Sequence, residues 1–180
     1  MIKLTIILVL VILVLLGILT ILTLIGRLKY LNKKVIYSEG LIEEYTSKRI
    51  KLLVKLNASI KKTLRAKKDY LSNLEELESD SISFQEKDIK LSEYNKTITN
   101  LLIDYTKLSN SKDIKKQVSS LNELNEKNDA TKTYFNQCTI KLSNTIKKFP
   151  NNILSKFLKI KIIPLYETNE IIKQITDENL

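Results

Sequence analysis

An uninterrupted apolar run near the start of the sequence limits the possible folds more than any other feature. It extends from Leu4 to Ile25, 22 residues without a charged side chain. At about 1.5 Å per residue, a helix of this length covers about 33 Å, which matches the roughly 30 Å hydrocarbon core of a bilayer. The run exceeds the roughly 7–15 apolar residues of a cleaved signal peptide, and no small-residue cleavage site follows it. We therefore expect residues 1–26 to form a membrane anchor with its span at residues 4–25.

The charges on either side of the span predict its orientation. Only Lys3 precedes it, whereas four basic residues follow it closely: Arg27, Lys29, Lys33 and Lys34. The positive-inside rule then places the amino terminus outside the cell membrane and the rest of the chain in the cytoplasm. A single unpaired cysteine, Cys138, also fits the cytoplasm. These flanking basic residues lie close enough to the bilayer to contact lipid headgroups.

Beyond the span, apolar residues recur at steps of three and four, which is typical of amphipathic helices. Residues 91–108 follow a heptad pattern, and the pattern in residues 114–149 is interrupted by polar Asn128 and Thr131. With only three glycines and two prolines, the sequence has too few turn formers for a sheet-rich fold. We expect an all-α fold, in which a single transmembrane helix is followed by a long antiparallel up-down bundle of three to four helices.

The expected bundle comprises residues 27–158. Its helices are predicted at about 27–79, 84–108 and 111–149, with a short helix at 151–158. Serine-rich breaks at 79–81 and 109–111 supply caps for the helices that follow, and Pro150 ends the third helix. Residues 159–180 are expected to form a tail that packs on the bundle or is partly disordered.

The residue types present exclude most familiar catalytic chemistry. The chain has no histidine and one cysteine, which removes histidine-based acid–base catalysis, histidine-ligated zinc, cysteine-rich metal sites and internal disulfides. Carboxylates near residue 76 lack the Glu-x-x-His pattern of helical di-metal sites, and Cys138 falls on an apolar helix face. We therefore predict no catalytic, cofactor-binding or metal-binding residues, and we expect that the protein is not an enzyme.

A run of nine basic residues without an acidic residue lies between Lys48 and Lys68. Anionic lipid, nucleic acid and an acidic protein are the possible partners. If the helix continues from the span, Lys48 lies about 33 Å beyond Ile25, far outside the ~8 Å Debye length. Residues 46–69 also contain no aromatic side chain on which bases could stack, so nucleic acid is not expected. The leading interpretation is a solvated helix face, and a protein partner is the alternative.

Two blocks of the sequence have a recognisable pattern: TYFNQCTIKLSNTIKKFPNNILSKF at residues 133–157 and RIKLLVKL at 49–56. The first resembles the carboxyl-terminal signature of the LemA family of bacterial membrane proteins, and the second resembles a block in that family's first helix. The matching positions are Arg49, Leu52, Leu53, Leu56, Phe135, Asn136, Asn144, Phe149, Pro150 and Asn152. Lys51, Val54 and Lys55 depart from the family pattern. The resemblance implies a single-pass membrane protein with a long helical bundle in the cytoplasm and no established chemistry.

These observations favour a non-catalytic membrane protein that acts as a scaffold or adaptor through protein–protein contacts. Its expected partners are the lipid bilayer and either an unknown protein or a second copy of the chain, because the heptad pattern of residues 91–108 suits a partner helix as well as an internal one. No cofactor is expected. The alternative is an outward-facing sensor or receptor whose helical bundle binds a small ligand.

Overall fold

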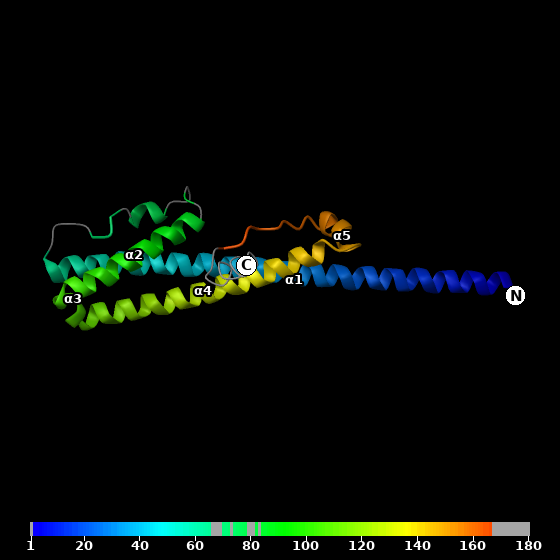
Figure 1. Cartoon of the computed structure of the whole chain (residues 1–180). Coiled ribbons are helices and arrows are strands. Elements are labelled where there is room, and N and C mark those ends of the chain that lie inside the picture. Colours follow the sequence, from blue (N-terminus) through cyan, green and yellow to red (C-terminus); the bar gives the residue numbers. More distant parts are fainter. Residues whose placement is uncertain (1, 66–69, 73, 79–81, 83, 167–180) are drawn as a thin grey trace, which may run out of the picture. The chain divides into compact units, whose positions relative to one another are not determined.

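The computed structural model describes residues 2–65, 70–72, 74–78, 82 and 84–166. Within these ranges the chain forms helices and no strand (Figure 1), which confirms the all-α prediction. In chain order the elements are α1 (Ile2–Leu64), the 3₁₀ helix η1 (Leu74–Glu78), α2 (Phe84–Asp104), α3 (Thr106–Asn110), α4 (Lys112–Ile146) and α5 (Asn151–Phe157). The segment that follows α5 has no regular structure up to Tyr166, and the rest of the expected tail lies outside the described residues.

The expected span forms the first part of α1. This helix is long and apolar enough to cross a membrane, by its length and composition. Residues 3–23 are exposed along their whole length, Leu24 and Ile25 are half-buried, and Leu28 is completely buried. Cover by the rest of the chain therefore begins at the carboxyl end of the apolar run.

The chain divides into two compact units. The anchor unit comprises residues 1–37 and 134–165, and the body unit comprises residues 38–133 and 166–180. Because α1 and α4 contribute residues to both units, the boundary cuts across the single bundle expected at residues 27–158. Each unit is described by itself below.

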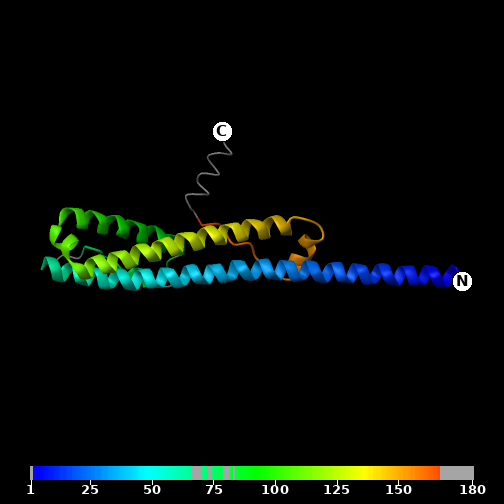
Figure 2. The same cartoon turned by 90° about the horizontal axis from the view of Figure 1, so that it is seen from below.

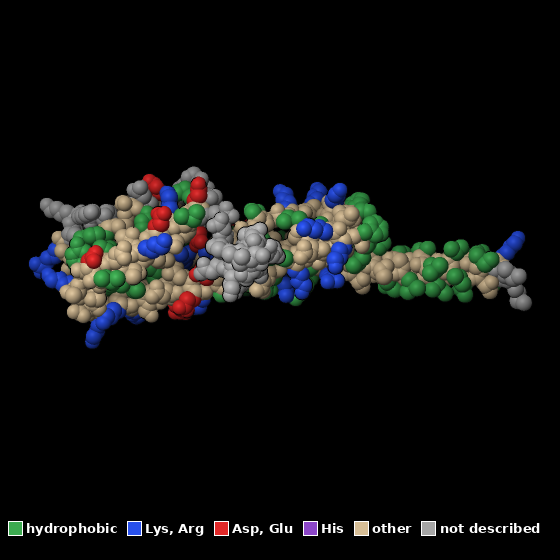
Figure 3. All heavy atoms as spheres, in the orientation of Figure 1, with side chains coloured by type: hydrophobic (Ala, Val, Ile, Leu, Met, Phe, Trp, Pro, Cys, Tyr) green, Lys and Arg blue, Asp and Glu red, His purple; other side chains and the backbone are tan. Residues whose placement is uncertain are grey.

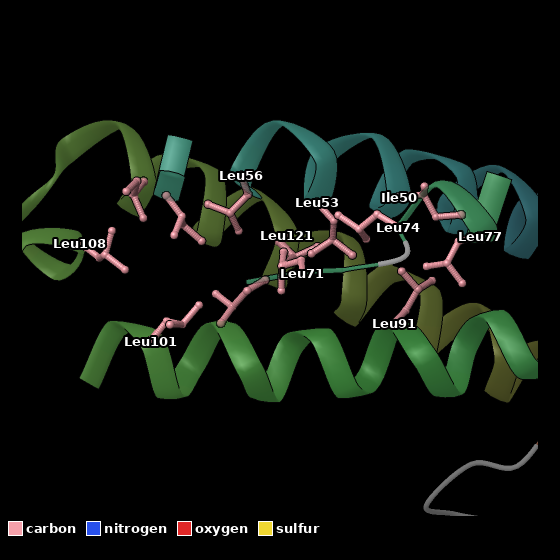
Figure 4. Packing of buried hydrophobic residues seen from close by; sticks show 13 residues of the cluster. Ile50, Leu53, Leu56, Leu71, Leu74, Leu77, Leu91, Leu101, Leu108 and Leu121 are labelled. Carbon is pink, nitrogen blue, oxygen red and sulfur yellow. The ribbon is translucent and has the colours of Figure 1, made fainter. Parts of the chain in front are cut away.

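The body unit has its own apolar core (Figure 4). Leu53, Leu56 and Ile60 on α1 pack in one cluster with Leu91 on α2 and Leu121 on α4, and each of these side chains is at most 2% exposed. The buried cluster also includes Ile50, Leu71, Leu74, Leu77, Ile98, Leu101, Leu108 and Ile114. The heptad residues of α2 and α3 thus pack within the chain's own core.

The expected helix at 27–79 is shorter than predicted, because α1 ends at Leu64. Arg65 has a φ of 51°, in the left-handed region that commonly terminates helices. Residues 70–72 and 74–78 then form a return pass along α2 and the neighbouring Tyr105. The Tyr70 and Tyr105 rings meet at 6.3 Å, the Tyr94 hydroxyl donates to the Ser72 carbonyl at 2.5 Å, and Lys90 pairs with Glu76 at 3.4 Å.

This order of contacts fixes the chain directions within the body unit. Tyr70, Ser72 and Glu76 contact Tyr105, Tyr94 and Lys90 in reverse order, so the return pass is antiparallel to α2. The up-down alternation is therefore kept, but the second pass is the short segment that contains η1, and α2 is the third pass. Consequently α2 runs in the same direction as the neighbouring part of α1 (Figure 2). The expected break at 79–81 lies outside the described residues.

The second expected helix, at 84–108, is divided. Tyr105 has an extended backbone, with φ −121° and ψ 98°, and separates α2 from α3. After α3, the Ser111 hydroxyl accepts a hydrogen bond from the Ile114 amide at 3.5 Å, as an N-cap of α4 does. Helix α4 ends at Ile146, three residues before the expected end, and the Phe149–Pro150 peptide that precedes α5 is cis.

In the anchor unit, the carboxyl-terminal part of α4 lies beside α1 (Figures 1 and 2). Leu28 and Val35 on α1 and Phe135 and Leu142 on α4 are at most 1% exposed. Cys138 is also buried, on the same face of α4 as Leu142. The Asn151 side chain donates to the Thr145 carbonyl at 3.2 Å and ties the start of α5 to the end of α4.

Candidate functional site: an ion cluster in the body unit

Asp88 on α2 joins two buried cations that come from two other helices. Its Oδ1 accepts a hydrogen bond from Arg49 Nη1 of α1 at 2.9 Å, and its Oδ2 accepts one from Lys132 Nζ of α4 at 2.5 Å. Only 5% of the Arg49 and Lys132 side chains is exposed, against 26% for Asp88. Because these charge-assisted bonds need all three side chains in place, the ion cluster fixes the register of α1, α2 and α4 at this level.

Polar groups on α4 complete the cluster. Asn128, which is completely buried, donates from Nδ2 to Asp88 Oδ1 at 3.5 Å, and Lys132 also contacts Asp129 at 3.3 Å. Arg49 Nε and Asn128 Oδ1 are buried without a hydrogen-bond partner. A buried polar group without a partner lowers the free energy of unfolding. These two atoms therefore offset part of the stabilisation that the bonds to Asp88 provide.

The charges of the cluster determine how Asp88 titrates. Burial by itself raises the pKa of the Asp88 carboxyl, but Lys132 and then Arg49 outweigh it and hold this pKa below its ordinary value. The carboxylate is therefore ionised at neutral pH. An ionised carboxylate between two cations is a hydrogen-bond acceptor and not a proton donor.

The charge of Asp88 also acts on Tyr166. Burial, followed by repulsion from Glu39, Glu43 and Asp88, raises the pKa of the Tyr166 phenol to about 12. Burial also raises the pKa of Glu39, and the Glu43 charge adds to this effect. Within the body unit, the phenol of Tyr166 therefore lies in surroundings that disfavour its ionised form.

The two sequence blocks lie in different units. In the first block, Arg49 belongs to the ion cluster, Leu53 and Leu56 are in the core of the body unit, and Leu52 packs against that core. The second block is in the anchor unit, where Phe135 and Asn136 are buried and Pro150 is half-buried. The remaining three positions, Asn144, Phe149 and Asn152, are exposed.

The flanking basic residues lie in the anchor unit. Lys3, Arg27, Lys29 and Lys33 are exposed. Lys34 Nζ lies over the Tyr30 ring at 4.7 Å and near the Tyr134 ring at 6.0 Å. Hydrogen bonding to Tyr30, and next to Tyr134, raises the pKa of Lys34. Tyr30 and Lys34 thus form an amphipathic cluster a few residues beyond the apolar run.

Sequence reasoning identified Arg49 through the resemblance but missed Asp88, Lys132 and Tyr166. One available signal was the polar interruption at Asn128, four residues before Lys132 on α4. Residues spaced in this way share a helix face. That spacing places polar groups on the buried face of α4, but it does not indicate which acidic residue pairs with them. Across the described residues, no group of three His, Cys, Asp or Glu side chains could hold a metal ion.

Comparison with known protein families identifies the chain's family. The model of the LemA family matches residues 39–177, which is more than half of the chain. Neither the curated proteins nor the solved structures contain a protein that matches.

Proposed function

The chain belongs to the LemA family, and we propose that it is a non-catalytic protein, anchored in a cell membrane by one helix, that acts as a scaffold or adaptor. In this proposal the anchor unit attaches the protein to the bilayer, and the body unit presents its surface to other proteins.

The observation that carries the proposal is the packing of the body unit. It has its own apolar core, and its most buried charged groups, Arg49 and Lys132, are bound to Asp88. A fixed register of α1, α2 and α4 gives the body unit a defined surface. That surface carries apolar side chains, because Ile89 and Ile103 on α2 are 60% and 72% exposed. Exposed apolar side chains beside charged ones suit a protein contact.

We also propose that the body unit lies in the cytoplasm and the amino terminus lies outside. The flanking basic residues support this orientation, since basic residues near a span stay on the cytoplasmic side. The anchor unit adds six lysines from residues 134–165 and contains no acidic residue. A reporter fused to the carboxyl end should be active in the cytoplasm. Activity only outside would contradict the orientation and would favour the outward-facing sensor.

Protein contact can be tested in native membranes with a photoreactive amino acid at Ile89 or Ile103. Either position should give discrete cross-linked products that contain a second polypeptide, which is a different protein or another copy of this chain. The same amino acid at Leu8, in the apolar run, is the matched control and should cross-link to lipid. If both body-unit positions give no protein adduct while Leu8 labels lipid, the scaffold proposal is wrong.

A further inference from the structure

Helix α5 buries polar side chains and exposes apolar ones. Asn151 and Ser155, four residues apart, are 7% and 4% exposed, and they bond to the Thr145 and Asn152 carbonyls. Ile153 and Phe157, also four residues apart, are 47% and 81% exposed. Because residues spaced by four share a helix face, α5 turns an apolar face away from the anchor unit. This arrangement is the reverse of the one expected for a helix on a water-facing surface.

Phe149 extends this apolar surface. It lies two residues before α5 and is 80% exposed. We call Phe149, Ile153 and Phe157 the apolar corner. Two phenylalanines exposed to this degree and close together in the chain form an apolar patch of a kind that marks an interaction site.

Within the anchor unit, the apolar corner lies next to the carboxyl end of the apolar run. The first residues of α1 that the rest of the chain covers are Leu24 and Ile25, at the end of that run. Both ribbon views place α5 beside this part of α1 (Figures 1 and 2). In the space-filling view, apolar side chains gather at the edge of the anchor unit from which the bare helix emerges (Figure 3).

The charge of the anchor unit identifies the partner. Residues 1–37 carry five basic side chains, residues 134–165 carry six, and neither segment contains an acidic residue. Lys147, Lys148 and Lys156 are exposed and lie within two residues of Phe149 or Phe157. An apolar surface surrounded only by cations suits an anionic lipid surface, which attracts basic residues within about a Debye length.

We propose that the apolar corner inserts into the headgroup region of the same anionic bilayer that holds residues 4–25. The protein then has a second membrane contact, which the span does not require. Phe149, Ile153 and Phe157 enter the boundary between headgroups and acyl chains, and the neighbouring lysines bind lipid phosphates. This contact orients the anchor unit against the membrane surface. The inference rests on the proposed membrane anchoring.

The protein contains no tryptophan, so a single Phe157→Trp substitution provides a specific fluorescent probe. The full chain is reconstituted in vesicles of phosphatidylglycerol and phosphatidylcholine, with and without brominated acyl chains. Because Phe157 is exposed, the substitution should leave the fold intact. We expect emission at shorter wavelength than in water, and quenching by brominated lipid that is severalfold stronger than for Ile103→Trp, the matched control on the body unit.

Two further comparisons separate the possible failures. Leu15→Trp, within the span, should be quenched whether or not the corner inserts, so a lack of quenching there would refute the anchoring itself. If Leu15→Trp is quenched but Phe157→Trp is quenched no more than Ile103→Trp, the corner does not insert and the inference is wrong.

The lipid charge is tested with the same probe. In phosphatidylcholine alone, or after Lys147→Gln, Lys148→Gln and Lys156→Gln together, the quenching of Phe157→Trp should fall by at least half. Equal quenching in both lipid compositions and in the lysine variant would overturn the assignment to anionic lipid.

Discussion

At the scale of single residues, Asp88 supplies the negative charge that compensates two buried cations. Arg49 and Lys132 are both 95% covered, and Asp88 is the acceptor that binds both. Removing charge from water is costly, and a buried ion pair offsets this cost only while both partners are present. Loss of Asp88 should therefore cost more than the loss of an ordinary surface pair.

Asp88→Asn tests this balance. The change leaves Arg49 and Lys132 without their shared counter-charge, and because Asp88 is 26% exposed, we expect a loss of about 2–3 kcal/mol, below the value for a fully buried pair. Urea unfolding of the detergent-solubilised protein, followed by circular dichroism, measures the loss. Glu123→Gln removes the partner of exposed Lys127 and should leave the midpoint nearly unchanged. Equal midpoints for the two variants would refute this account.

The difference in unfolding free energy between the wild type and Asp88→Asn should depend on pH. The folded-state pKa of Asp88 lies below its ordinary value of 3.8, so the ionised carboxylate stabilises the fold fully above about pH 4. This stabilisation is lost as the pH falls from there through the lowered folded-state pKa. The difference in unfolding free energy between wild type and Asp88→Asn should therefore shrink below about pH 4. A difference that grows with acidification would contradict the assignment.

Tyr166 should titrate late in the folded protein. Its pKa is raised to about 12 from 10, so the protonated phenol supports the fold below about pH 10, and this support is lost as the pH rises through 12. A rapid pH jump with ultraviolet detection measures phenolate before the protein unfolds. In Tyr166→Phe, the absorbance change at high pH should decrease by one phenol. In urea, Tyr166 of the wild type should titrate at its ordinary pKa because unfolding removes the burial. If Tyr166→Phe shows the same absorbance change at high pH as the wild type, the raised pKa does not belong to Tyr166.

Sequence alone reaches Arg49 but not the residues around it. Periodicity identifies which positions of a helix face inward, and it correctly places Leu53, Leu56 and Phe135 in the interior. Pairing between charges on different helices depends on their axial register, which no spacing within one helix reveals. Asp88 is separated from Arg49 by 39 residues and from Lys132 by 44, and it could not be chosen from the other acidic residues.

At the scale of elements, α1 packs one face into the core and leaves the other in solvent. Leu53 is completely buried in the core, whereas the next residue, Val54, is 43% exposed. Because adjacent residues on a helix point in directions about 100° apart, the two positions have different environments despite similar chemistry. They form a matched pair for testing the core.

Leu53→Ala should cost about 2–5 kcal/mol, because a buried leucine truncated to alanine leaves a cavity. Val54→Ala should change the unfolding free energy by no more than about 0.5 kcal/mol. Urea unfolding of the two variants under identical conditions measures both. If the two variants lose the same free energy, the packing of α1 in the body unit is wrong.

The order of passes could not be predicted from periodicity. Leu71, Leu74 and Leu77 repeat every three residues, which continues the helical pattern of α1. Their burial in the core is as the pattern indicates, but they belong to the return pass and not to α1. The apolar pattern records which residues are buried and not where the backbone reverses, and Arg65 is not a residue type that favours the left-handed region.

At the scale of the whole molecule, the acidic residues are confined to one of the two units. All 20 acidic residues belong to the body unit, although the basic residues occur in both. The heptads and the apolar run indicated a span followed by helices, but a division that runs through α1 and α4 has no marker in the sequence. No glycine- or proline-rich linker separates the units, because the two helices continue from one into the other.

The flanking basic residues should determine the topology. Replacing the four that follow the span, Arg27, Lys29, Lys33 and Lys34, by glutamine removes the charge bias across it. A fraction of the molecules should then insert with the body unit outside. Paired phosphatase and fluorescent-protein reporters at the carboxyl end measure the two orientations. The control is the replacement of four lysines of the body unit, Lys48, Lys51, Lys55 and Lys61, which lie too far along the chain from the span to bias insertion. Equal effects of the two sets would refute the prediction.

The positions of the core and cluster residues in the chain also imply an order of folding during synthesis. The buried apolar cluster of the body unit is complete once Leu121 has left the ribosome, and Lys132 follows eleven residues later. The anchor unit needs residues 134–165 to meet residues 1–37, which end 97 residues earlier in the chain. At about 5–20 residues per second, several seconds pass between the synthesis of residues 1–37 and that of the segment that completes the anchor unit. Translation therefore completes the apolar core of the body unit before the anchor unit has both of its segments.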